Sequence, residues 1–105
     1  MVSGADRRRE GEVAEKTRPK TDQPKLYKVI LHNDDYTTME FVIAILESVF
    51  TKSPAEAYRI MMHVHTQGVG IAGVYPFEVA ETKVVMVDER AKDAGHPLRC
   101  SLEPE

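Results

Sequence analysis

Most of the chemistry that this sequence offers lies in two short polar clusters, the first of which is Asn33-Asp34-Asp35. Two carboxylates and an amide supply oxygen acceptors directly after an apolar run from Leu26 to Leu31. Asn and Asp favour turns because their side chains accept hydrogen bonds from the backbone that follows them. Acidic groups there also suit the N-terminus of a following helix. The cluster therefore predicts a strand-to-helix turn and leaves open a second role, which is to hold a ligand.

The second cluster is His63-Val64-His65. Two residues that are two positions apart lie roughly 200° apart around a helix, so His63 and His65 point to different faces and cannot readily share one metal ion. Met61 and His65 are four residues apart and share a side. A histidine at the edge of an apolar stripe is more often a boundary residue than a functional one. This cluster alone therefore leaves both interpretations of His65 open.

The segment after the first cluster has the pattern of an amphipathic helix. Thr37-Thr38-Met39-Glu40 has the form of a capping box, with Thr37 as the N-cap and Glu40 as its partner. The apolar residues behind it recur at helical spacing: Met39, Val42, Ile43, Leu46, Val49 and Phe50. We expect a helix that begins beside the acidic turn.

Two further helices are expected downstream. Ser53 caps the first of these, Pro54 takes the tolerated first helical position, and Gly68 stops it. Its apolar stripe is Ala57, Ile60, Met61 and Val64. The other helix runs from about Phe77 to Ala94 and ends at Gly95, and its inward-facing residues are Ala80, Val84, Val87, Ala91 and Ala94.

Three strands complete the pattern. The first is Leu26 to Leu31, and the second runs from Val69 to Tyr75, where Gly70 and Gly73 indicate a bulge or close packing. In the last, Leu98, Cys100 and Leu102 alternate with polar residues. The order β-α-α-β-α-β predicts an α+β fold, a two-layer α/β sandwich with three helices and a three-stranded antiparallel sheet.

Length and composition limit the organisation to one domain. The chain has 105 residues, of which 42% are hydrophobic and 30% charged. Residues 1–24 are polar and poor in aromatic groups, so we expect a disordered N-terminal extension followed by a single domain over residues 25–105. Residues 26–105 hold seven basic and twelve acidic residues, a net charge of −5. Such a domain repels phosphate backbones, which argues against nucleic acid and favours a cationic ligand group.

Cysteine use and hydropathy point to a cytoplasmic protein. Cys100 is the single cysteine of the chain, which excludes an intrachain disulfide and the usual Cys-x-x-Cys motifs. No stretch approaches the 18 apolar residues of a membrane span, and residues 1–24 do not resemble a signal peptide. Nothing demands more than a monomer.

Four segments in matching order resemble the ClpS family. The run from Asn33 to Val42, NDDYTTMEFV, is similar to the family pattern NDDYTPMEFV, and HVHTQG from His63 to Gly68 resembles its HVHxxG segment. EVAETKV from Glu78 to Val84 and HPL from His96 to Leu98 match its third helix and its closing motif. The resemblance covers about residues 25–103. It implies a non-enzymatic adaptor, without metal or cofactor, that binds proteins beginning with Phe, Tyr, Trp or Leu and delivers them to a ClpA-like AAA+ unfoldase paired with ClpP.

The resemblance also assigns roles to residues. It implies that Asn33, Asp35 and His65 hold the α-amino group of the substrate. It implies a side-chain pocket lined by Leu31, Asp34, Thr37, Met39, Val42, Met61, Val64 and Leu98, with Met39 as a gate against β-branched residues. Tyr36, Glu78 and Lys83 match positions at the unfoldase contact. Thr38 departs from the family proline, and His32 departs from the usual aliphatic residue beside the pocket entrance, which leaves the preference among the four first residues open.

Three alternatives remain at this stage. One is an enzyme that uses His65 with Asp34 or Asp35 as acid and base, although no nucleophile motif accompanies them. Another is a plain interaction domain, because the same element order occurs in the C-terminal domain of the ribosomal stalk protein. The third is a metal site built from His32, His63, His65 and the aspartates.

Overall fold

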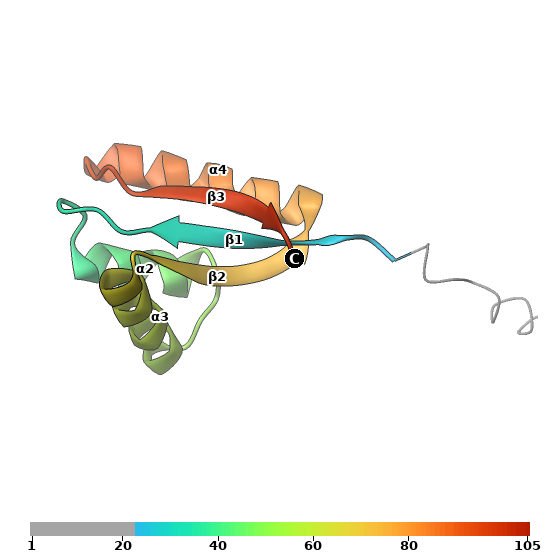
Figure 1. The fold of residues 1–105 in the computed structure, drawn as a ribbon. Coiled ribbons are helices and arrows are strands. Elements are labelled where there is room, and N and C mark those ends of the chain that lie inside the picture. The colour runs from blue at the N-terminus through green and yellow to red at the C-terminus, as the bar shows by residue number, and fades with distance from the viewer. Residues whose placement is uncertain (1–22) are drawn as a thin grey trace, which may run out of the picture.

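The computed structural model describes residues 23–105, which form three helices and three strands in the predicted order (Figure 1). The elements are β1 Leu26–His32, α2 Met39–Ser48, α3 Pro54–Gln67, β2 Val69–Pro76, α4 Phe77–Ala94 and β3 Arg99–Pro104. Both neighbours of the central strand run antiparallel to it, in the order β2-β1-β3. The predicted α+β sandwich is confirmed. The expected extension, residues 1–24, lies outside the described residues apart from Gln23 and Pro24.

One face of the sheet carries the core. Val29 and Leu31 of β1 are fully buried there, as the two-residue period of a strand requires. Helix α4 lies along all three strands, while α3 packs against both α2 and the edge strand β2. Ile45, which was not among the expected stripe residues of α2, is also buried in this core. The three helices thus close one layer over the sheet (Figure 1).

The N-cap of α2 corrects the sequence prediction by one residue. Thr38, not Thr37, is the cap: its backbone is extended, and its Oγ1 accepts a hydrogen bond from the N–H of Phe41 at 3.1 Å. The reason is that Asp34 already binds both the N–H and the hydroxyl of Thr37. The acidic turn therefore extends one residue further before the helix begins.

The ends of α3 and α4 follow their capping residues. Ser53 Oγ accepts the N–H of Glu56 at 3.2 Å, and Pro54 opens α3 as predicted. Gly68 and Gly95 end α3 and α4 in left-handed conformations, with φ of 92° and 77°. Ala94, however, is exposed rather than inward-facing, and Val84 is only half-buried. Ala94 is the last residue of α4, directly before its C-cap Gly95, and the helical period alone does not bury it.

The predicted bulge lies in β2. The pairing with β1 shifts between Val29 and Ile30, so that Ala72 is the extra residue beside Gly73. Close packing requires a glycine at position 70, because a Cβ atom on Gly70 would lie 2.7 Å from Cγ2 of Val64. Its absence lets the last turns of α3 pack directly on β2. This close approach brings the second polar cluster to the edge of the sheet.

Candidate functional site

The turn after β1 is organised by the Asp34 carboxylate. Oδ1 accepts hydrogen bonds from the N–H groups of Tyr36 at 2.8 Å and Thr37 at 2.7 Å, and Oδ2 accepts the hydroxyl of Thr37 at 2.7 Å. Partial burial alone raises the pKa of Asp34. The bonds from Thr37 and Tyr36, aided by the charge of His96, outweigh it and lower the pKa below its ordinary value. Asp34 is therefore ionised, and its hydrogen bonds stabilise the turn.

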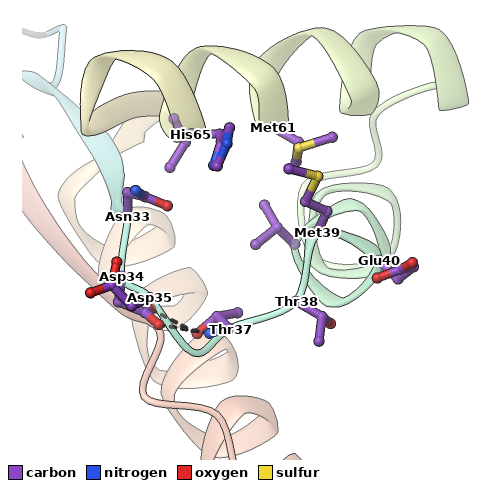
Figure 2. A pocket seen from close by; sticks show the side chains of 11 residues that line it. Asn33, Asp34, Asp35, Thr37, Thr38, Met39, Glu40, Met61 and His65 are labelled. Atoms are coloured by element: carbon purple, nitrogen blue, oxygen red, sulfur yellow. Dashed lines mark hydrogen bonds between the residues drawn. The ribbon is translucent and has the colours of Figure 1, made fainter.

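A backbone hydrogen bond joins the two polar clusters. The N–H of Asn33 donates to the carbonyl of Gly68 at 2.9 Å, where β1 has ended and α3 is stopping. Since His65 lies in the last turn of α3, this bond sets Asn33 and His65 on facing walls of one space (Figure 2). The left-handed Gly68 lets the chain pass from α3 into β2 at that point.

Two helices supply the apolar walls of that space. Met39 and Val42 come from the first turn of α2, and Met61 and Val64 come from α3. Met39 is 42% exposed, whereas Val42, Met61 and Val64 are buried. Both methionine side chains project between the helices at the end away from His65 (Figure 2). One wall is therefore flexible and open to solvent, and the other is packed.

Together these groups enclose a cavity of about 430 Å³, within the ~300–1,000 Å³ usual for small-ligand sites. It is lined by Asn33, Asp34, Asp35, Thr37, Thr38, Met39, Glu40, Val42, Met61, Val64 and His65. One end of the cavity carries the Asn33 amide, the Asp35 carboxylate and the His65 imidazole. Met39 and Met61 line the other end, with Thr38 and Glu40 beside Met39 (Figure 2). The lining holds three carboxylates and neither lysine nor arginine, so it suits a ligand with a cationic head and an apolar body.

Two residues that the resemblance assigned to the pocket are buried in the core. Leu31 is fully buried and Leu98 is 5% exposed, and both belong to the hydrophobic core rather than to the cavity lining. Leu31 shares its strand face with Val29 and points toward the core. Leu31 and Leu98 share this core with Val42, Met61 and Val64, which do line the cavity, so a place in the pocket for these two leucines stays a prediction.

His32 is also placed differently from the expectation. Its Nε2 lies 2.8 Å from the Ser101 hydroxyl, on the sheet face opposite Leu31 and away from the cavity. His63 faces a separate groove between α3 and the sheet, so it does not join His65. Within residues 23–105 no group of three or more His, Cys, Asp or Glu side chains is arranged to hold a metal ion.

The three residues at the expected partner contact do not lie together. Tyr36 is 79% exposed at the tip of the turn, at the C-terminal end of β1. Glu78 follows β2, whose last residue pairs with the N-terminal end of β1, so a strand of seven residues, roughly 20 Å, separates the two sites. Lys83 is half-buried and donates to the carbonyl of Val49 at 2.7 Å.

Two lining residues escaped the sequence analysis. Thr38 and Glu40 flank Met39 at the start of α2, and both line the cavity. Their signal was present in the motif that runs from Asn33 to Val42, but the misplaced N-cap assigned Glu40 to capping, and Thr38 was considered only as a departure from the family proline. Because Thr38 is the N-cap, Glu40 is not needed as the capping partner of Thr37, and it lies at the rim of the cavity.

The chemistry of the cavity is that of a binding site. Its lining contains no serine, cysteine or lysine, and both threonine hydroxyls already have partners: Thr37 donates to Asp34, and Thr38 accepts from Phe41. The Thr37 hydroxyl proton is therefore committed to Asp34. A small two-layer α+β module with such a cavity defines a class of ligand-binding modules.

Comparison with known proteins is consistent with that class. Residues 22–101 match the family model described as ATP-dependent Clp protease adaptor protein ClpS. The chain is 57% identical over 95 residues to the ATP-dependent Clp protease adapter protein ClpS of Desulfatibacillum aliphaticivorans, which covers 90% of this chain and 91% of the relative. It is 58% identical over 93 residues to the protein of the same name from Maricaulis maris, covering 89% of this chain and 85% of that one.

A solved structure is also similar. Agrobacterium tumefaciens ClpS2 bound to L-phenylalaninamide superimposes with a TM-score of 0.76 at 44% identity, covering 79% of this chain and all of that one. The chain therefore belongs to the ClpS family, whose members are adaptor proteins of the Clp protease rather than enzymes. In keeping with this, no helix within residues 23–105 has the length and apolar character needed to cross a bilayer.

Proposed function

We propose that this adaptor binds proteins that begin with Phe, Tyr, Trp or Leu and delivers them from the cytoplasm to a ClpA-like unfoldase paired with ClpP. The α-amino group is held by Asn33, Asp35 and His65, and the first side chain enters the cavity between α2 and α3. One observation carries the proposal: polar acceptors and an apolar space meet in a single cavity that is lined by both clusters (Figure 2). The ligand of the similar ClpS2 structure, L-phenylalaninamide, combines a free amine with an aromatic side chain.

The amine is the source of selectivity for a chain start. A free α-amino group has an ordinary pKa of about 7.7–8.0, so it is largely cationic at neutral pH. It carries three donors and needs acceptors when it leaves water. The Asp35 carboxylate, the Asn33 carbonyl and a neutral nitrogen of His65 supply three. An internal peptide group offers one donor and no charge, so the site discriminates against it.

The apolar space supplies much of the affinity. Burying an aromatic side chain of about 150–250 Å² contributes roughly 4–6 kcal/mol. Ordering and association costs offset part of this gain, so binding also needs the contacts to the amine, and we expect an affinity of micromolar order. The thioethers of Met39 and Met61 adjust to rings and to Leu because they are flexible and polarisable.

The experiment is a titration with fluorescent peptides that differ only in the first residue. Peptides with free N-terminal Phe, Tyr, Trp or Leu should bind, and N-acetylation of the Phe peptide should weaken binding by at least about tenfold. Asp35→Asn should have a similar effect, while Asp93→Asn on the exposed side of α4 is the matched control with the same charge change. Equal affinity for the free and acetylated peptides would exclude the proposed grip on the amine.

The unfoldase contact belongs to the same proposal. Glu78 and Lys83 both lie on the N-terminal half of α4, and we propose that each contributes to the unfoldase contact, with the chain as a monomer. Tyr36 lies at the other end of β1, beside the cavity, so it contacts a different part of the unfoldase or the substrate that is being delivered.

A further inference from the structure

The sulfur atoms of the described chain differ widely in exposure. Residues 23–105 contain Met39, Met61, Met62, Met86 and Cys100. Met39 is 42% exposed and Met61 only 3%, while the other three are partly buried. Met39 is thus the one sulfur residue of this region that is largely open to solvent, and it lies at the rim of the cavity.

We propose that Met39 is a site of reversible oxidation by peroxides, and that its sulfoxide switches off recognition of apolar first residues. In this step a sulfur lone pair attacks one peroxide oxygen. With hydrogen peroxide, the S–O bond forms as the O–O bond breaks and the sulfur loses two electrons. The hydroxyl now on sulfur gives its proton to the departing hydroxide, which leaves as water. The loss of recognition rests on the proposed function, whereas the oxidation itself does not.

The position of Met39 explains why the free protein tolerates the added oxygen. A sulfoxide is polar and needs hydrogen-bond donors when it is buried. Because Met39 begins α2 and is largely exposed, its sulfoxide can remain in water while α2 stays folded. Its neighbours in the cavity, Val42, Met61 and Val64, offer no donor.

The added oxygen therefore destabilises the complex with the ligand rather than the free protein. A ligand side chain that fills the apolar end of the cavity removes water from the sulfoxide. The Thr38 side chain points away from that of Met39, and the Asn33 amide lies at the polar end of the cavity (Figure 2). Bound ligand leaves the oxygen without a good partner, and the flexible apolar wall becomes a polar one.

The thiol of this chain is a poor competitor for peroxide. Burial, and to a lesser extent the charge of Asp88, raise the pKa of Cys100 to about 12. Its side chain contacts the carbonyl of Val84 at 3.9 Å. Because the thiolate is the reactive form, Cys100 stays largely inert at neutral pH. We therefore expect a mild oxidant to react with the exposed thioether of Met39 rather than with Cys100.

The test exposes the full-length protein to increasing hydrogen peroxide. Peptide mass spectrometry assigns the oxygen, and anisotropy measures binding of a Phe-initiated peptide. We expect Met39 to be oxidised before Met61, Met62 and Met86, with affinity falling by at least about tenfold as Met39 converts. Treatment with methionine sulfoxide reductases should restore it. Met39→Leu should keep its own untreated affinity after peroxide, and Met86→Leu, outside the cavity, should lose affinity as the wild type does.

Ligand protection provides an independent arm. A free Phe peptide at saturating concentration should slow oxidation of Met39 several-fold, whereas the acetylated peptide should not. Earlier oxidation of any other of these methionines, or unchanged peptide affinity after full conversion of Met39, would overturn the inference. Thermal unfolding of the oxidised protein must stay close to that of the untreated one, because a large fall would assign the loss of binding to unfolding. Failure of the untreated protein to bind a Phe peptide overturns the proposed function instead.

Discussion

At the scale of single residues, two adjacent carboxylates have different tasks. Asp34 uses both oxygens within the turn, on the backbone of Tyr36 and on Thr37. Asp35 is exposed and makes no such bond within residues 23–105. The same side-chain type therefore serves once to hold the loop and once to face a ligand. The two carboxylates differ in role although they are neighbours in the chain.

The task of Asp34 predicts a pH-dependent stability. Asp34→Asn should lower the free energy of unfolding at pH 7 by roughly 1–2 kcal/mol, because the amide replaces charge-assisted bonds. The pKa of Asp34 is lowered in the fold, so its contribution is complete above its ordinary pKa of about 3.9 and is lost as pH falls through the lower folded value. Urea unfolding at pH 7, 5 and 3 measures both proteins.

The difference between the two proteins should therefore persist from pH 7 to 5 and shrink toward pH 3. Thr37→Val, which removes only the hydroxyl donor, should reproduce part of the loss. Asp93→Asn serves as the control for charge. A constant difference across this range would show that the Asp34 bonds do not depend on its ionisation.

At the scale of elements, a hydrogen bond links α4 to the C-terminal end of α2. The last turn of α2 has no basic residue of its own, and Lys83 of α4 donates to the Val49 carbonyl at its C-terminal end. The Lys83 ammonium also lies 5.5 Å from the centre of the Tyr75 ring, which stacks on Phe50. Since the other end of α2 carries Met39 and Val42, this anchor supports one wall of the cavity.

Lys83→Met keeps the apolar stem and removes the ammonium. We expect it to lower the free energy of unfolding by about 1–2 kcal/mol, because a half-buried carbonyl loses its charged partner. Lys25→Met, at an exposed position before β1, is the control with the same change of charge. Chemical denaturation compares the two. If both variants match the wild type, the hydrogen bond contributes nothing and Lys83 serves the unfoldase contact alone.

At the scale of the whole molecule, the cavity and the start of the domain lie at opposite ends of β1. The cavity follows His32, whereas residues 1–22 join the domain before Leu26 (Figure 1). The point at which residues 1–22 join the domain is therefore remote from the site. The two ends of β1 can therefore serve different steps of delivery, one at the substrate and the other at the protease.

Deleting residues 1–22 should leave the affinity for a Phe peptide within about twofold, because mutations so distant rarely couple. We expect it to reduce degradation of a Phe-initiated substrate by the unfoldase and ClpP, because the segment joins the domain beside Glu78, at the proposed unfoldase contact. A scrambled segment of equal length distinguishes sequence from length. Unchanged degradation by the deleted protein would make the segment a passive linker.

The correct and incorrect predictions have physical causes. Ser53, Gly68 and Gly95 were predicted correctly as caps because capping depends on residues within one turn. The prediction of Thr37 as the N-cap was wrong because Asp34, three residues earlier, accepts hydrogen bonds from both the N–H and the hydroxyl of Thr37. The prediction of Ala94 as inward-facing was wrong because periodicity identifies a face of the helix but does not by itself bury its last residue.

The sequence by itself determined the order of elements, most of their ends and the two polar clusters, since each depends on residues close along the chain. Only the tertiary structure decided that Asn33 and His65 face one cavity, through the bond to Gly68 and the close packing that Gly70 permits. It likewise placed Leu31 and Leu98 in the core that they share with Val42, Met61 and Val64 of the cavity lining. Which wall a side chain reaches depends on how strand and helices pack, and spacing along the chain does not encode that packing directly.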